Sequence, residues 1–170
     1  FEIARRLLQS GAPASFVAVD IYPIPGGKVD VNNGIGRMVS MALVGACREW
    51  PEATPEKRQQ IWQQHKDYAQ ELIWFLRTDP SVPEATRKTM SQYGYCKDEF
   101  AAFGHWPPAL YVREARRMVG EHVLTQADIR TTVTKPDSIG IGCFPIDSHD
   151  CQRVATADGG WTNEGTIFQI

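Results

Sequence analysis

The residues best suited to chemistry gather near the end of the chain, in the ten-residue stretch FPIDSHDCQR at 144–153. Its side chains of interest are Asp147, His149, Cys151 and Arg153. Three interpretations fit these residue types: a metal site, a Cys/His nucleophile pair, or a polar wall beside a ligand bound mainly by other residues. Ligands adjacent in the chain rarely converge on one ion, and zinc sites usually take their ligands from separated positions. We therefore predict no metal site here.

A nucleophile pair would consist of Cys151 and His149. On a strand the two side chains would share one face, because side chains two residues apart point the same way. A reactive thiolate also needs a group that lowers its pKa and donors that stabilise an oxyanion. No neighbouring residue type indicates either, so the polar wall is the favoured interpretation.

A second group of candidates is the run REARR, which places Arg113, Arg116 and Arg117 within five residues. A solvated charged surface is one explanation of such a run. A clamp for an anion is the other, because a guanidinium presents paired donors that match a carboxylate or a phosphate. On a strand, Arg113 and Arg117 would share one face. The residues alone leave both interpretations open.

A third group, GGKVDVNN, follows a proline and contains Lys28, Asp30, Asn32 and Asn33. Turn chemistry explains it most simply, since Asp and Asn satisfy local backbone groups. Alternatively, Lys28, Asp30 and Asn32 alternate onto one face of a strand and offer hydrogen bonds to a heteroaromatic ring.

The clearest element that could position these groups is a helix beginning at Thr54. Thr54 is a good N-cap and Pro55 suits the first helical position. One stripe of residues then recurs at three- and four-residue spacing to about Arg77, formed by Ile61, His65, Tyr68, Leu72 and Leu76. The spacing of Ser81 and Glu84 is that of a capping box and predicts the start of a second helix.

The remaining pattern predicts an α+β fold. The run RMVSMALVGACREW favours a buried helical segment, and β-branched or glycine-rich stretches favour strands at about 15–32, 109–124 and 137–170. A helix is the alternative for 109–124, since Val112, Ala115, Met118 and Val119 also fit one helical face. We expect a single domain over residues 1–170. In it, a helical portion at about 35–105 packs on a mixed or antiparallel β-sheet formed by about 12–34 and 109–170.

The composition excludes two classes of partner. Apolar residues make up 42% of the chain and charged residues 22%, which is ordinary for a soluble globular protein. The formal net charge of -2 predicts no nucleic-acid partner. No apolar run approaches the roughly 18 residues of a membrane span, so we predict no membrane partner. Because neither end has the character of a natural terminus, we expect an internal piece of a longer protein.

Four segments together resemble one family. They are YPIPGGKVDVNN, KDEFAAFGHWPPALYVREARRMVGEHVLTQADI, DSIGIGCFPIDSHDCQR and WTNEGTIFQI. In this order they look like a group of bacterial FAD-dependent oxidoreductases, and the resemblance spans most of the 170 residues. LYVREARRMVGEHVLT and the DSIGIG and PIDSH motifs are its most specific parts.

The resemblance implies the substrate-side, or cap, domain of a two-domain Rossmann-type flavoprotein. Its cofactor would be FAD, with the main binding motif outside this chain. The partner would be the FAD-binding Rossmann portion of the same protein, whose glycine fingerprint does not occur in this sequence. Such a fragment would be active only as part of the full-length enzyme, cytoplasmic or exported in a bacterium.

The resemblance also suggests roles for the candidate residues. The chain would line the flavin and substrate site for hydride transfer from a small, possibly anionic substrate. The catalytic residues would be His149, as the base, and Arg117. The substrate would contact Arg113, Arg116, Asp147 and Arg153, and the flavin would contact Lys28, Asp30, Asn32 and Asn33. The alternative is a non-catalytic domain that binds a ligand or another protein.

Overall fold

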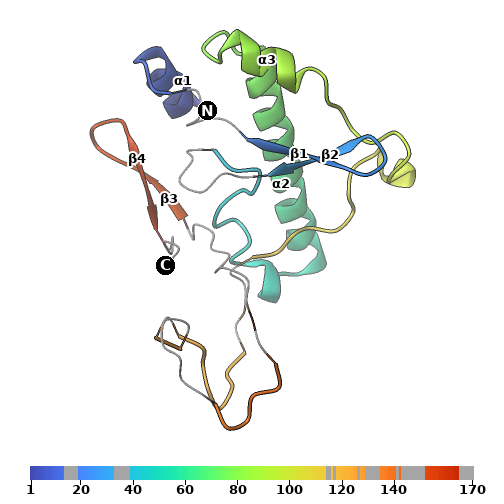
Figure 1. The fold of residues 1–170 in the computed structure, drawn as a ribbon, viewed down its shortest axis with the longest axis vertical. Coiled ribbons are helices and arrows are strands. Elements are labelled where there is room, and N and C mark those ends of the chain that lie inside the picture. The colour runs from blue at the N-terminus through green and yellow to red at the C-terminus, as the bar shows by residue number, and fades with distance from the viewer. Residues whose placement is uncertain are drawn as a thin grey trace.

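The computed structural model describes residues 1–13, 19–32, 39–113, 116, 118–125, 127–128, 135–140, 142 and 152–164. Its α-helices are α1 (Glu2–Gln9), α2 (Pro55–Thr78) and α3 (Glu84–Met90). Short 3-10 helices span Trp50–Glu52 and Ala101–Phe103. The strands β1 (Asp20–Ile24), β2 (Lys28–Asn32), β3 (Gln152–Ala155) and β4 (Trp161–Glu164) form two antiparallel hairpins (Figure 1). The predicted α+β class is confirmed.

Helix α2 begins where the sequence predicts. The hydroxyl of Thr54 accepts a hydrogen bond from the backbone N–H of Lys57 at 3.3 Å, and Pro55 occupies the first helical position. Hydrogen bonds from its own backbone N–H and from Thr54 lower the pKa of Glu56, so its carboxylate stays ionised at the positive end of the helix. The helix ends at Thr78, one residue after the predicted end.

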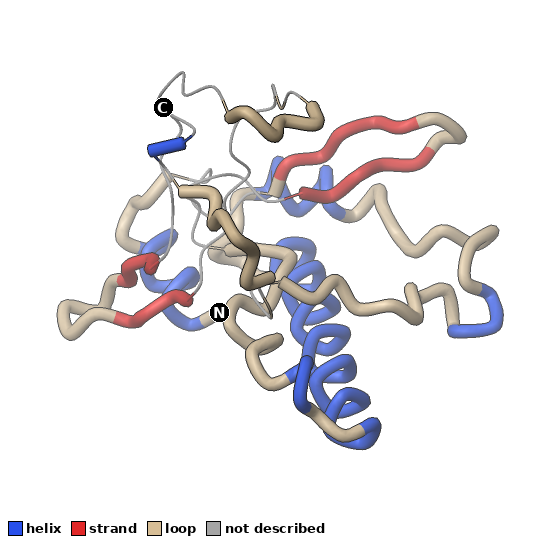
Figure 2. The backbone as a smooth tube through the Cα atoms, turned by 90° about the horizontal axis from the view of Figure 1, so that it is seen from below, coloured by secondary structure: helices blue, strands red, loops and turns tan. Residues whose placement is uncertain are grey.

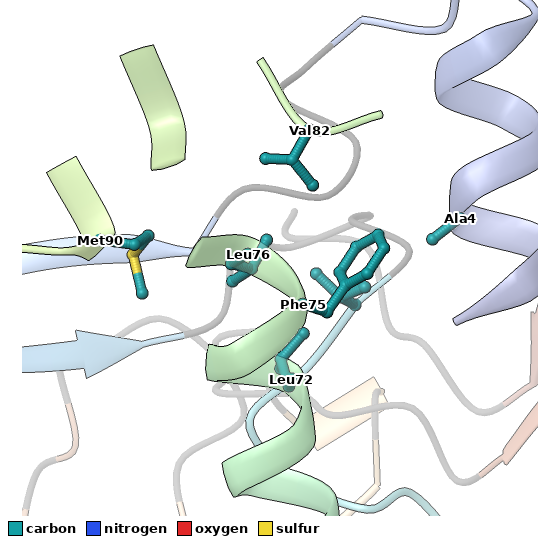
Figure 3. Packing of buried hydrophobic residues seen from close by; sticks show 7 residues of the cluster. Ala4, Leu72, Phe75, Leu76, Val82 and Met90 are labelled. Atoms are coloured by element: carbon teal, nitrogen blue, oxygen red, sulfur yellow. The ribbon is translucent and has the colours of Figure 1, made fainter. Parts of the chain in front are cut away.

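The core lies along one stripe of α2. Leu72 and Leu76 are fully buried and Phe75 is nearly so, and the three point into the same cluster (Figure 3). Ala4 of α1 and Met90 of α3 are packed against this stripe, so α2 joins the two shorter helices. The cluster is completed by Val39 and Val82.

The β1–β2 hairpin follows from the Pro-Gly-Gly sequence. Gly26 and Gly27 have φ angles of +86° and +74°, a conformation that costs glycine little. They allow the chain to reverse so that Ile24 pairs with Lys28 and Asp20 pairs with Asn32. Ile21 of β1 packs on the core cluster, which attaches this hairpin to α2.

The β3–β4 hairpin lies beside α1 in both views (Figures 1 and 2). Arg153 pairs with Asn163, and Ala155 pairs with Trp161. The turn approaches α1 closely, since a Cβ added at Gly159 would lie 3.6 Å from Nη1 of Arg6. The described strands of the 137–170 region are therefore β3 and β4.

The predicted helical segment RMVSMALVGACREW is wrong over its described part. Residues 39–43 are irregular and 44–49 form turns, and only a single 3-10 turn follows at Trp50–Glu52. Gly45 adopts a φ of +81°, which no α-helix accommodates, and Pro51 disfavours the helical conformation for the residue before it. Apolar composition alone did not distinguish a buried helix from a buried series of turns.

The predicted strand at 109–124 is also wrong for its described residues. Residues 109–113, 116 and 118–124 belong to neither a strand nor a helix, and the 118–125 segment extends away from the helices in Figure 1. Met118 and Val119 are 89% and 94% exposed, so the alternation of this segment does not reflect a buried face. A strand needs a neighbour for its backbone hydrogen bonds, and the described strands pair only within the two hairpins.

The predicted cap of α3 at Ser81 is wrong as well. The helix begins at Glu84, after Pro83, and has no side-chain cap. The hydroxyl of Ser81 instead donates to Asp79 Oδ1 at 2.6 Å. The hydroxyl that was predicted to cap α3 is therefore bound to the carboxylate of Asp79 instead.

Among the described residues, no helix is both long and apolar enough to cross a membrane.

Candidate functional site

The predicted site residues divide into two sets. Those that lie outside the described residues are His149, Arg117, Asp147 and Asn33. Those that the structure describes are Lys28, Asp30, Asn32, Arg113, Arg116 and Arg153.

The residues predicted to contact the flavin lie on β2. The ammonium of Lys28 pairs with Asp98 at 3.1 Å and with Glu99, and hydrogen bonds to Glu99 and then Asp98 raise its pKa. Asn32 donates to Asp30 Oδ2 at 3.3 Å, and both residues are exposed. The hairpin therefore presents Asp30 and Asn32 outwards, while Lys28 ties its turn to the 98–99 segment.

Two of the predicted arginines have different surroundings. Arg116 is exposed and pairs with Glu52, near the start of α2. Arg113 is half-buried, and its guanidinium carbon lies 4.8 Å from the ring centroid of Tyr111, a cation–π distance. Of the two, Arg113 is the one whose guanidinium packs against an aromatic ring.

Arg153 lies on β3, with its guanidinium carbon 5.7 Å from the ring centroid of Trp161 on β4. Its charge also reaches α2. Burial raises the pKa of Tyr68, and the nearby positive charge of Arg153 opposes that rise. The hydroxyl of Tyr68 donates to the backbone carbonyl of Ser40 at 2.8 Å. The guanidinium of Arg153, from a distant part of the chain, is therefore close enough to α2 for its charge to act on this phenol.

One turn before Tyr68, α2 carries a thiol–imidazole pair. Sγ of Cys47 lies 3.3 Å from Nε2 of His65, and Nδ1 of His65 lies 2.7 Å from the carbonyl oxygen of Ile61. A carbonyl can only accept, so Nδ1 donates to Ile61 and Nε2 faces the sulfur. The same sulfur is 3.9 Å from the carbonyl oxygen of Tyr111.

These contacts define one group, which we call the His65 cluster: Ser40, Cys47, His65, Tyr68 and Arg153. It joins the 39–47 segment and β3 on one side of α2, and the Tyr111 carbonyl brings the 111–113 segment to the same side. An imidazole, a phenol and a guanidinium together can hold an anion and move a proton.

The sequence indicated only part of this cluster. His65 and Tyr68 belong to the predicted stripe of α2. Their polar groups within a buried stripe were the available indication of a site. No pattern in the sequence indicated Cys47 as a member, because 18 residues separate it from His65. The Cys/His pair considered from the sequence was Cys151 with His149. It was not favoured, and both residues lie outside the described part of the chain.

We expect the substitution of Tyr68 by phenylalanine to reduce the free energy of unfolding by about 1–2 kcal/mol. The carbonyl of Ser40, a residue only 3% exposed, would lose its hydroxyl donor. Urea unfolding measures the change. Tyr95→Phe is the control, since the Tyr95 hydroxyl bonds Gln70 on the surface, and its effect should stay below about 0.5 kcal/mol. Equal effects of the two substitutions would contradict this account.

A cleft of about 1360 Å³ lies elsewhere on the molecule. Its walls are the last two turns of α2, the turn of the β1–β2 hairpin, the 92–98 segment and the start of α1. Lys28 is the single predicted site residue in its lining, and none of the His65 cluster belongs to it.

The described residues contain no group of three or more His, Cys, Asp or Glu side chains placed to hold a metal ion.

One of the comparisons with known proteins identifies a family. A family model described as FAD dependent oxidoreductase matches residues 3–170. No curated protein and no solved structure matches the chain. The match covers almost the whole sequence, and the family uses FAD as its cofactor. The chain belongs to the FAD dependent oxidoreductase family.

Proposed function

We propose that this chain forms the substrate-side, or cap, part of the enzyme and lines the site where a small anionic substrate gives a hydride to the flavin. His149 removes a proton from the substrate, and Arg113 and Arg117 hold the substrate anion. Arg116, Asp147 and Arg153 support the substrate, and the β1–β2 hairpin contacts the flavin.

The meeting of two predicted segments at the His65 cluster carries this proposal. Arg153 belongs to the FPIDSHDCQR segment, and its charge acts on Tyr68 of α2. The REARR segment begins two residues after Tyr111, whose carbonyl lies 3.9 Å from the sulfur of Cys47. Both segments therefore reach the same face of one helix. This is the arrangement expected if an arginine clamp and a proton acceptor serve one substrate.

Chain connectivity supports the same grouping. His149 precedes Arg153 by four residues, and a chain spans at most about 3.6 Å per residue. His149 therefore belongs to the same short segment as the described Arg153. Arg117 is likewise four residues from Arg113.

The described residues fit the flavin ring better than the phosphates of FAD. Asp30 and Asn32 are exposed on β2 and offer an acceptor and donors to a polar ring edge. A pyrophosphate usually needs the N–H groups of a helix start. In α2, however, Thr54 and Glu56 already occupy these groups, so we assign no described residue to the phosphates.

The cofactor and the side chains of this protein supply different parts of the reaction. Bound FAD supplies the acceptor for a hydride. The imidazole of His149 takes the proton of the substrate, a role that suits a group titrating near neutral pH. Arg113 and Arg117 orient the substrate through paired N–H donors and stabilise negative charge that develops on its oxygen. Tyr111 restrains the guanidinium of Arg113 by stacking.

Replacement of His149 by glutamine in the full-length holoenzyme tests this function. We expect anaerobic flavin reduction by a panel of small hydroxy acids and amino acids to slow by about 10²–10⁴-fold. The wild-type rate should also rise with pH as His149 loses its proton, and this dependence should disappear in the variant. Stopped-flow absorbance of the flavin measures both.

His122→Gln is the matched control, because His122 is exposed and pairs with Asp128. Its rate and pH profile should equal those of the wild type. A His149 variant with an unchanged profile would remove His149 from the mechanism. A holoenzyme that none of the acids reduces would favour a non-catalytic ligand-binding domain.

A further inference from the structure

None of the His65 cluster lines the cleft of about 1360 Å³, although Phe1 in its lining stacks on Tyr68. Nine residues separate His65 from Trp74, which lines the cleft, and this is two and a half turns at 3.6 residues per turn. The two side chains therefore project from opposite faces of the helix. The cleft exceeds the roughly 300–1,000 Å³ typical of small-molecule sites, so it has room for a ligand of that size.

Its wall combines aromatic surface with hydrogen-bonding groups. Trp74 is 67% exposed and Tyr95 is 50% exposed, and Tyr93 stands close by in the lining. A tryptophan so exposed leaves a large apolar ring in water, and covering it with a flat ring is favourable. Gln70, one turn before Trp74 on the same stripe of α2, donates to the hydroxyl of Tyr95 at 2.7 Å. That bond fixes one side of the aromatic wall.

The described lining of the cleft carries four cations and four carboxylates, so the charge that a ligand meets depends on which of these side chains are already paired. Of its four cations, Arg5 pairs with Asp79 and Lys28 pairs with Asp98. The other two, Arg77 and Lys97, form no ion pair with any carboxylate in the described part of the chain.

One carboxylate in the lining, Glu71, likewise has no ion-pair partner among the described residues. The unpaired cations, Arg77 and Lys97, therefore outnumber it. Arg77 follows Trp74 by three residues, so the guanidinium and the indole occupy neighbouring positions on one helix face. A ring stacked on Trp74 would bring its own substituents within reach of Arg77.

We propose that this cleft is a second ligand site, which binds a planar aromatic anion. The ring of the ligand stacks on Trp74 and contacts the tyrosines. Its carboxylate or equivalent acid group binds Arg77 and Lys97, because paired guanidinium donors match a planar anion. Gly26 and Gly27 form part of the opposite wall, and nothing lies within 4 Å of a Cβ built at either, so the wall is open at this point.

The test uses 2-naphthoate as the probe and 2-naphthalenemethanol as its neutral counterpart. Calorimetric titration of the full-length holoenzyme should show that the acid binds more tightly than the alcohol, and that added salt reduces only the difference between them. Trp74→Leu should weaken both probes by about five- to tenfold. Arg77→Gln should weaken the acid by about threefold and leave the alcohol unchanged.

Lys88→Gln on α3 is the matched control, because it removes the same charge from an exposed residue that does not line the cleft. It should leave both affinities unchanged, and circular dichroism should show all three variants folded. The proposal is overturned if the acid and the alcohol bind equally well. It is also overturned if Trp74→Leu retains wild-type affinity, or if Lys88→Gln weakens the acid as much as Arg77→Gln does.

Discussion

Replacing Leu72 by alanine is expected to reduce the free energy of unfolding by about 3 kcal/mol, the largest effect on stability that we predict for a single substitution. Leu72 is fully buried in the core cluster, where α1 and α3 are packed against α2 (Figure 3). Alanine would remove apolar contact and leave a cavity that the three helices can fill only in part. A domain of ordinary stability, about 5–15 kcal/mol, would lose a large fraction of it.

Urea unfolding monitored by circular dichroism measures this loss as a lower midpoint with an unchanged slope. Leu124→Ala is the control, since Leu124 is 69% exposed and its truncation should change stability by less than about 0.5 kcal/mol. A Leu72 variant as stable as the Leu124 variant would show that the α2 stripe is not the core.

Replacing Asp79 by asparagine is expected to cost about 2 kcal/mol near neutral pH. One oxygen of Asp79 accepts from Nε and Nη2 of Arg5 at 3.0 and 2.8 Å. The other accepts from the backbone and hydroxyl of Ser81 at 3.0 and 2.6 Å. The carboxylate thereby links α1 to the turn between α2 and α3. We take about 2 kcal/mol as an upper value, because water reaches Arg5 and screens the pair.

The cost should depend on pH in a defined direction. Burial alone would raise the pKa of Asp79, but the hydrogen bonds from Arg5 and Ser81 outweigh it and lower the pKa to about 2. The folded pKa is thus below the ordinary value of 3.8, so the stabilisation is present above about pH 4 and is lost as the pH falls towards 2. The wild-type and Asp79→Asn proteins should therefore converge in stability at acid pH.

Urea midpoints across this pH range provide the measurement, with Arg5→Gln and Arg6→Gln as a matched pair. Arg6 is on the same helix but makes only a 3.9 Å contact with Glu2. Arg5→Gln should reproduce most of the Asp79 effect, whereas Arg6→Gln should have almost none. A constant difference between the wild type and Asp79→Asn from neutral to acid pH would contradict the assignment.

Elements with local causes could be predicted from the sequence. Thr54 caps α2 because its hydroxyl lies within reach of an N–H three residues later. The two glycines after Pro25 form the turn of the first hairpin, because they accept positive φ angles. Each of these two features depends on only a few consecutive residues.

Elements that depend on distant partners could not be predicted in this way. The 109–124 region alternates well enough for a strand, yet its described residues have no neighbouring strand to pair with. Ser81 had the spacing of a helix cap, but its hydroxyl donates to Asp79, whose carboxylate is held by Arg5, 74 residues away in the chain. In both cases the local pattern favoured one structure, but contacts with residues elsewhere in the chain determined another.

The sequence by itself determined the family, the α+β class and the start of the long helix. Four ordered motifs and a few capping and turn residues suffice for these. Only the tertiary structure decided that Cys47 lies against His65, that Arg153 acts on Tyr68, and that Trp74 lines a cleft. These contacts join residues far apart in the chain, and they follow from how α2 is packed and which of its faces is covered.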